Sequence, residues 1–232
     1  MSAVQHSLQQ SLQRALRYQF NSPALLEQAL THRSAGGSNN ERLEYLGDGL
    51  LNFVIGEAAY TQWHKAPEGD LSRLRASLVC EDSLARIAKG LHISDCLRMG
   101  GGEFKSGGYR RESILADALE ALIGAIYLDG GFAAARETTL HLFAEALATL
   151  PKPETLKDSK TRLQEWLQAL SRPLPEYRVL SEHGPPHQRV FRVACKLTDS
   201  GHETAADGLS RKQAEQDAAR LMFETIKGAA NA

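Results

Sequence analysis

The sequence predicts two domains of different fold class, an all-α domain followed by a smaller α+β domain. Between residues 8 and 147, apolar residues recur at helical spacing and no convincing run of strand alternation interrupts them. Residues 151–155 include two prolines, which break helices and favour an extended linker. Helix and strand patterns then share the rest of the chain. We therefore expect a first domain over 1–150, a linker over 151–158 and a second domain over 159–228.

Clusters of turn residues divide the all-α part into successive helices. These clusters lie at residues 21–23, 34–39, 66–70, 100–108 and 129–131. The glycine-rich cluster at 100–108 is accompanied by Lys105, Arg110 and Arg111. It is either a phosphate-contacting loop or an ordinary solvated loop.

The second part begins and ends with a helix. Its patterns predict helices over 161–170 and 210–226, and strands over 176–180 and 190–197. Ser210 and Gln213 form a capping box at the start of the last helix. Arg211 and Lys212 lie in its first turn, where the helix dipole opposes cations, so a bound phosphate would explain them. Two solvated basic side chains are the alternative.

Composition is that of a soluble globular protein, with 42% hydrophobic and 24% charged residues. No apolar run reaches the ~18 residues of a membrane span and the N-terminus is polar, so we expect a cytoplasmic protein without a membrane partner. Cys80, Cys96 and Cys195 lack metal-site or disulfide spacing. With a net charge of −1, binding of a polyanion requires local placement of Lys and Arg.

Two predicted helices carry acidic stripes. In the first, Glu41, Glu44 and Asp48 fall within about 60° of one another around the helix axis. We expect the opposite face to be buried through Leu43, Leu46, Leu50, Phe53 and Val54. The second helix, over 112–128, is apolar nearly all round except for Asp117 and Glu120.

Burying Asp117 and Glu120 without a partner would cost several kcal/mol each. An Arg or Lys partner is one solution. The other is a hard divalent cation, Mg²⁺ or Mn²⁺, held by oxygen ligands from both stripes. Two stripes together, one of them inside an apolar helix, favour the metal.

The chain resembles bacterial ribonuclease III in a series of motifs that occur in the family's order. They are ALTHRS at 29–34, NERLEYLGD at 40–48, EGD at 68–70, KSGG at 105–108 and RESILAD at 111–117, followed by Glu120. The segment SRKQAEQ at 210–216 is similar to the double-stranded RNA-binding domain that follows the nuclease domain in this family. The resemblance therefore spans essentially the whole chain.

The resemblance implies a homodimeric, Mg²⁺-dependent endonuclease that cuts both strands of duplex RNA, with Mn²⁺ able to substitute and no small-molecule cofactor. It implies 5′-phosphate and 3′-hydroxyl ends with two-nucleotide 3′ overhangs, and ribosomal RNA precursors and structured messages as substrates. It also implies an all-α nuclease domain followed by an α-β-β-β-α domain.

Residue roles follow from positions that match the family's motifs. Glu44, Asp48, Asp117 and Glu120 match the metal cluster, with Asp48 and Glu120 also catalytic. Glu41 and Glu68 match further acids that line the catalytic valley of the dimer. Tyr45 matches an aromatic residue that packs into the partner subunit, although a core side chain is an equally good interpretation from the sequence.

Recognition of A-form RNA should depend on shape, because its major groove is too narrow for side chains. The proposed contacts are Thr161, Gln164 and Glu165 on one helix, His187 in a loop, Ser210, Arg211 and Lys212 at the last helix, and Arg110 and Arg111 in the first domain. Two positions depart from the family pattern. Gly49 stands where serine is usual, and Ala206 stands where a glycine is expected before the last helix, which bears on the turn that presents Arg211.

Two other classes of function compete with the nuclease. A duplex-RNA-binding regulator would keep the fold without cutting, but a degenerate nuclease is expected to lose at least one of the four acids of the metal cluster. A phosphohydrolase acting on small nucleotides would leave the second domain without a purpose.

Overall fold

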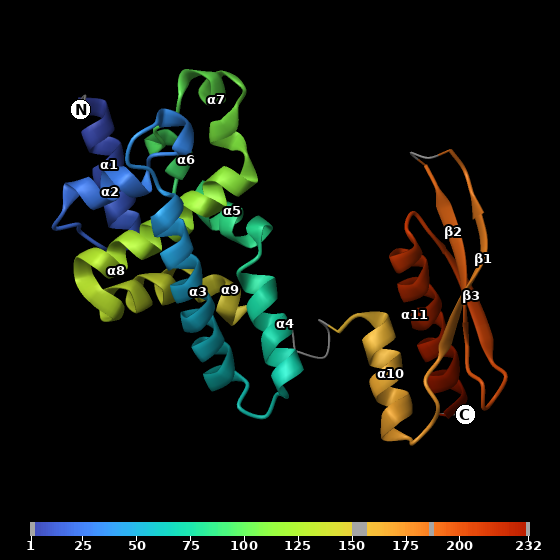
Figure 1. Ribbon diagram of the computed structural model, residues 1–232. Coiled ribbons are helices and arrows are strands. Elements are labelled where there is room, and N and C mark those ends of the chain that lie inside the picture. The colour runs from blue at the N-terminus through green and yellow to red at the C-terminus, as the bar shows by residue number, and fades with distance from the viewer. Residues whose placement is uncertain (1–2, 150–156, 186–187, 231–232) are drawn as a thin grey trace. The chain divides into compact units, whose positions relative to one another are not determined.

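The computed structural model describes all residues except 1–2, 150–156, 186–187 and 231–232 (Figure 1). The chain divides into two compact units, Met1–Pro153 and Glu154–Ala232. Unit 1 is helical and unit 2 is an α+β domain, so the predicted fold class is confirmed. Most of the predicted linker lies outside the described residues.

Unit 1 is built from helices of very different lengths. They are α1 (Ala3–Leu16), α2 (Pro23–Ala29), η1 (Arg33–Ala35), α3 (Glu41–Gln62), α4 (Glu68–Leu78), α5 (Glu81–Gly90), α6 (Ile93–Cys96), α7 (Gly101–Lys105), η2 (Gly108–Arg110), α8 (Glu112–Leu142) and α9 (Ala144–Ala148). The glycine-rich cluster at 100–108 is thus a short helix, a turn and the start of a 3-10 helix rather than a plain loop. The predicted break at 129–131 is a kink inside α8, where Gly131 has a φ of 79°.

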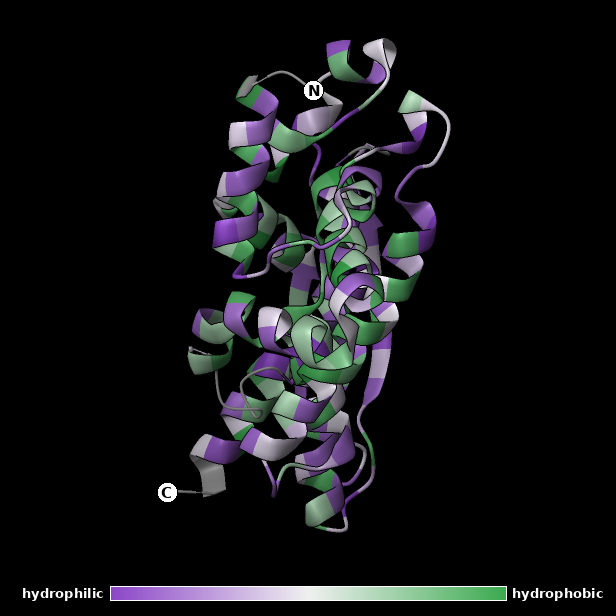
Figure 2. Ribbon diagram, turned by 90° about the vertical axis from the view of Figure 1, so that its left-hand side faces the viewer, coloured by the Kyte–Doolittle hydropathy of each residue, from purple (hydrophilic) through white to green (hydrophobic). Residues whose placement is uncertain are grey.

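Helix α8 is the centre of the unit 1 core. Its residues from Ile114 to Ile126 are mostly buried, and it packs against α3 and α5. Figure 2 shows hydrophobic and hydrophilic residues alternating along the helices, as expected of amphipathic helices that cover a core. By length and composition α8 is also able to cross a membrane, but half of the qualifying window is buried inside the protein. The apolar character of α8 is therefore explained by its place in the core.

Two glycines allow α3 and α8 to cross in close contact. A Cβ atom on Gly47 would lie 1.8 Å from the main-chain oxygen of Glu120. A Cβ atom on Gly124 would lie 2.3 Å from the main-chain oxygen of Leu43. Only a hydrogen atom fits at either position, so the two glycines allow the short distance between the helices.

The buried face of α3 differs in part from the predicted one. Leu43 and Val54 are buried as expected, but Phe53 is 59% exposed, and Leu46 and Leu50 are only half-buried. The remaining buried positions are Gly47, Leu51, Ile55 and Ala59. The helix carries two adjacent apolar stripes, and the one that faces α8 supplies its buried core residues, whereas the other is only partly buried.

Asp129 joins the α8 kink to the connection between α1 and α2. Its carboxylate accepts hydrogen bonds from the Tyr18 hydroxyl and the Asn21 amide, both at 2.8 Å, and from the Ser22 amide at 2.9 Å. Burial raises its pKa, but the hydrogen bonds outweigh burial and hold the pKa of Asp129 below its usual value. This carboxylate therefore fixes the N-terminal helices against α8.

Unit 2 consists of a three-stranded antiparallel sheet and two helices, which Figure 1 shows on the same side of the sheet. The elements are α10 (Ser159–Ala169), β1 (Glu176–His183), β2 (Val190–Lys196), β3 (Glu203–Gly208) and α11 (Arg211–Ala230). The core joins Leu163 and Leu167 of α10 to Cys195 of β2 and Met222 of α11. The third strand, which only the family resemblance implied, is present.

Local hydrogen bonds fix the two helix starts of unit 2. The Gln213 amide donates to the Ser210 hydroxyl at 3.1 Å, so the predicted cap of α11 is confirmed. Asp158 caps α10 by accepting from the Thr161 amide at 2.9 Å. Ala206 pairs with Val193 in regular register inside β3. It is Gly208 that must lack a side chain, because a Cβ atom there would lie 2.5 Å from the Ala214 nitrogen.

Candidate metal centre and RNA-binding surface

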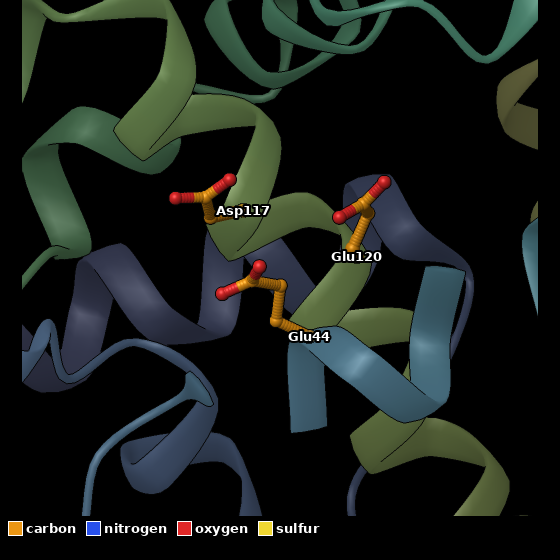
Figure 3. Close-up of side chains that lie close together, drawn as sticks. All are labelled: Glu44, Asp117 and Glu120. Atoms are coloured by element: carbon orange, nitrogen blue, oxygen red, sulfur yellow. The ribbon is translucent and has the colours of Figure 1, made fainter. Parts of the chain in front are cut away.

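Three carboxylates from two helices converge where α3 and α8 cross. Glu44 comes from α3, and Asp117 and Glu120 come from α8 (Figure 3). One oxygen from each carboxylate can be chosen so that all of them lie within 4.8 Å of one another. The close approach at Gly47 is one helical turn from Glu44 and involves the main chain of Glu120 itself. The glycine contact therefore places these acidic side chains together.

The electrostatics of this acidic cluster favour a cation. Burial raises the pKa of Glu120 to about 8, with further contributions from the negative charges of Asp48, Asp117 and Glu44. Burial and neighbouring acids also raise the pKa of Glu44 and of Asp117. Within the described part of the chain, none of the three carboxylates forms an ion pair with Arg or Lys.

Arg33 and His32 attract these partly buried acids only through Coulombic interactions without an ion pair among the described residues, so they do not replace a bound cation. Carboxylate oxygens are hard ligands, and three of them at this separation are suited to a hard divalent cation. A bound cation would offset the burial penalty and the repulsion that raise these pKa values. The acidic cluster could therefore hold a metal ion.

Asp48, the fourth predicted ligand, lies beside this cluster rather than within it. Its carboxylate accepts a hydrogen bond from the Asn52 side chain at 2.7 Å. Its negative charge is nevertheless the largest Coulombic contribution to the raised pKa of Glu120. Asp48 is thus an electrostatic neighbour of the cluster, held by the next turn of its own helix.

The other two predicted acids lie in different surroundings. Glu41 lies 3.6 Å from Arg33 and lines a pocket of about 350 Å³ that also contains Glu44 and Asp117. Glu68 is the first residue of α4, where its carboxylate accepts a hydrogen bond from the Ser72 hydroxyl at 2.8 Å. Glu68 does not line the pocket formed by the described residues of one protomer.

The same pocket contains charged residues that the sequence analysis did not single out. His32, Arg33 and Glu103 line it together with Arg111. Arg111 pairs with Glu103 at 2.9 Å, whereas Arg110 stacks over the Tyr109 ring at 5.0 Å and does not line the pocket. Of these, Arg111 was among the proposed RNA contacts, and the position of His32 and Arg33 in the ALTHRS motif was the available signal for those two.

An apolar surface lies beside the acidic cluster on the second stripe of α3. This apolar surface is a groove of about 470 Å³ lined by Tyr45, Leu46, Asp48, Gly49, Leu50, Phe53, Tyr127 and Phe132. Tyr45 is 84% exposed, so its interpretation as a core side chain is wrong. Phe53 packs edge-on against Phe132 with ring centroids 5.9 Å apart. An exposed aromatic surface of this kind is typical of a protein–protein interface.

In unit 2, the starts of α10 and α11 lie together. Lys160 pairs with Glu215 at 2.7 Å, and the Gln216 amide donates to Asp158 at 3.0 Å. Thr161, Gln164 and Glu165 follow on α10, and Glu165 pairs with Lys157 at 2.6 Å.

The basic residues at the start of α11 differ in their partners. Arg211 is paired with Glu215 at 2.9 Å, whereas Lys212 has no side-chain partner among the described residues. His187, the remaining predicted contact in this unit, lies outside the described residues.

Comparisons with known proteins agree with both units. Residues 22–147 match a family model described as ribonuclease-III-like, and residues 159–226 match the double-stranded RNA binding motif. Ribonuclease 3 of Alkalilimnicola ehrlichii is 56% identical over 217 residues, which cover 94% of this chain and 95% of the relative. Ribonuclease 3 of Nitrosococcus oceani is 54% identical over 208 residues, which cover 89% of each protein.

Solved structures similar to unit 1 include two of the nuclease domain of ribonuclease III from Campylobacter jejuni. One is 45% identical with a TM-score of 0.58, and the match covers 61% of this chain and 97% of that domain. The other structure concerns flexibility in the region involved in dimer formation of that domain. It is 47% identical with a TM-score of 0.57, and the match covers 58% of this chain and 95% of that domain. The chain belongs to the ribonuclease III family and is an endoribonuclease specific for double-stranded RNA.

Proposed function

We propose that the acidic cluster at the crossing of α3 and α8 is the catalytic metal centre. Glu44, Asp117 and Glu120 hold Mg²⁺ there, with Asp48 as the fourth acid, and Mn²⁺ substitutes. The observation that carries this proposal is the convergence of three carboxylates within 4.8 Å, none of which forms an ion pair with Arg or Lys in the part of the chain that the structure describes. When bound, the ion supplies the Lewis acidity that activates water and stabilises the departing 3′ oxygen.

The apolar surface on α3 supports a homodimer as the active form. Because the acidic stripe and the apolar stripe are neighbours on one helix, pairing two copies through Tyr45 and Phe53 brings their acidic clusters to a shared valley. Glu41 and Glu68 extend this valley. Two centres in one valley cut the two strands of a duplex and leave 5′-phosphate and 3′-hydroxyl ends with two-nucleotide 3′ overhangs.

Unit 2 binds the duplex by shape through the adjoining helix starts and through the loop that contains His187. Thr161, Gln164 and Glu165 reach the minor groove, while Ser210, Arg211 and Lys212 contact phosphates. In unit 1, Arg110 and Arg111 add contacts beside the acidic pocket. Ribosomal RNA precursors and structured messages in the cytoplasm are the proposed substrates.

A perfectly paired RNA of a few hundred base pairs tests this proposal. We expect short duplexes with two-nucleotide 3′ overhangs in Mg²⁺ or Mn²⁺, and intact RNA in Ca²⁺ or EDTA. Binding without cleavage under every one of these conditions would make the protein a regulator and contradict the proposal. Cleavage in EDTA would show that the reaction does not need a metal ion.

Replacing Lys212 with alanine is expected to weaken RNA binding uniformly. Loss of one phosphate contact should reduce affinity about 5- to 10-fold at 0.1 M salt and lower the slope of log K against log[salt] by about 1. Binding of unrelated duplexes at several salt concentrations measures both effects. Lys196→Ala, an exposed lysine on β2, is the control. A loss confined to one RNA sequence would argue against a phosphate contact.

A further inference from the structure

The side chains of Phe104 in α7 and of Tyr109 and Arg110 in η2 form a stack. The rings of Phe104 and Tyr109 are stacked with centroids 5.1 Å apart and an interplanar angle of 26°. The Arg110 guanidinium lies 5.0 Å from the centre of the Tyr109 ring. Phe104 is nevertheless 57% exposed. The stack therefore offers an aromatic surface to solvent, supported from within by a second ring.

The stack is attached to the wall of the acidic pocket. Glu103 and Arg111, which flank it in sequence, form an ion pair of 2.9 Å, and both line the pocket that contains Glu44 and Asp117. Gly108 packs directly on Glu103, since a Cβ atom there would lie 2.4 Å from the Glu103 carboxylate. Figure 1 shows α7 at one end of unit 1, away from α4. The segment is thus an ordered projection beside the proposed catalytic pocket.

The chemistry of this projection matches a nucleotide. Any base can stack on a flat aromatic ring, and cations beside the ring can bind the phosphate of the same nucleotide. Lys105 beside the stack and Arg110 within it are exposed, while the acidic Glu103 is neutralised by Arg111. A protein partner would need a larger apolar area than one exposed ring surrounded by charge.

Base pairing restricts which nucleotides can use this surface. Inside an RNA duplex both faces of each base are covered by neighbouring base pairs. Only a base that is unpaired, in a bulge or an internal loop, can stack on a side chain. We propose that the Phe104–Tyr109–Arg110 stack binds an unpaired nucleotide of the RNA close to the cleavage site, an inference that rests on the proposed metal-dependent nuclease. It makes the segment a determinant of which imperfect duplexes are cut efficiently.

The test compares one perfect duplex with a series that carries a single unpaired 2-aminopurine at successive positions around the cleavage site. With wild type, we expect quenching of 2-aminopurine fluorescence on binding in Ca²⁺ at one or two of these positions. Stacking on one aromatic side chain corresponds to an effect of about 5- to 150-fold. Phe104→Ala should therefore lose the quenching and at least about 5-fold in kcat/KM on those RNAs, while kcat/KM on the perfect duplex stays within about twofold.

Two conservative variants separate stacking from apolar bulk. Phe104→Trp should keep both the quenching and the rate, whereas Phe104→Leu should behave like Phe104→Ala although it stays apolar. Equal effects of Phe104→Ala on perfect and bulged RNA, or full activity of Phe104→Leu, would overturn the inference. Failure of the proposed function is a separate result, because wild type would then not cleave the perfect duplex in Mg²⁺.

Discussion

Replacing Gly47 with alanine is expected to destroy the metal centre and destabilise unit 1. The added Cβ atom would lie 1.8 Å from the main-chain oxygen of Glu120, which cannot rotate away as a side chain can. The helices α3 and α8 must move apart, and Glu44 then moves away from Glu120. Overpacking at such a contact costs about 3 kcal/mol. Thermal unfolding measures this loss, and cleavage of duplex RNA in Mg²⁺ should fall more than about 100-fold.

Gly56→Ala is the matched control on the same helix. Its Cβ atom would meet only the Arg75 side chain at 3.7 Å, an ordinary contact. Because alanine favours helix more than glycine does, this variant should be as stable as wild type or up to about 1 kcal/mol more stable. If Gly47→Ala were as stable and as active as Gly56→Ala, the close crossing would not be what holds the acidic cluster together.

The acidic cluster shows how much of a site helical periodicity can predict. Glu44, Asp117 and Glu120 lie on regular helices, so their angular positions followed from about 100° per residue. Which part of α3 meets α8 depends on Gly47 and on the Glu120 main chain, which are far apart in sequence. Spacing alone also gave Asp48 the same role as its neighbours. Helical spacing does not reveal the hydrogen bond that the Asn52 side chain donates to Asp48.

The exposed apolar surface of α3 and the strand β3 could not be predicted from sequence periodicity. Periodicity joined Leu43 and Phe53 into one face, because it does not reveal whether an apolar residue meets its own core or another surface. Strand β3 has the sequence ETAADG, which lacks the alternating β-branched residues that identify a strand. Strand β3 forms because the backbone N–H and C=O groups of β2 need hydrogen-bond partners. It pairs with β2 from Phe191 with Gly208 to Lys196 with Glu203.

Glu120→Gln is expected to abolish most cleavage while leaving the fold and RNA binding intact. The amide keeps the shape of the side chain but removes one of the charges that hold the cation. Loss of a residue that only hydrogen-bonds to a metal ligand typically lowers metal affinity or activity about 10- to 100-fold. Loss of a ligand itself should therefore lower the cleavage rate more than about 100-fold. Single-turnover cleavage in saturating Mg²⁺ measures this effect, and duplex binding in Ca²⁺ is the control. Turnover near that of wild type would remove Glu120 from the metal centre.

The same variant should change the pH dependence of stability in the absence of metal. The pKa of Glu120 is raised from 4.5 to about 8, chiefly by burial and then by the acids around it. Between these values the folded protein holds a proton that the unfolded chain has released, so the free energy of unfolding falls as pH rises from about 4.5 to about 8. A pKa change from 4.5 to about 8 corresponds to about 5 kcal/mol, which solvent screening of this partly exposed carboxylate reduces to on the order of 3 kcal/mol for wild type above this range, and glutamine does not incur this penalty.

Chemical denaturation in EDTA at pH 5 and pH 9 tests that difference. Metal-free Glu120→Gln should be more stable than wild type at pH 9, and the two should be similar at pH 5. Mg²⁺ should reverse the order at pH 9, because a cation that binds only the folded state stabilises it and the wild-type cluster binds it better. If wild type and Glu120→Gln had parallel pH profiles and equal responses to Mg²⁺, the repulsion among these acids would not be what a metal relieves.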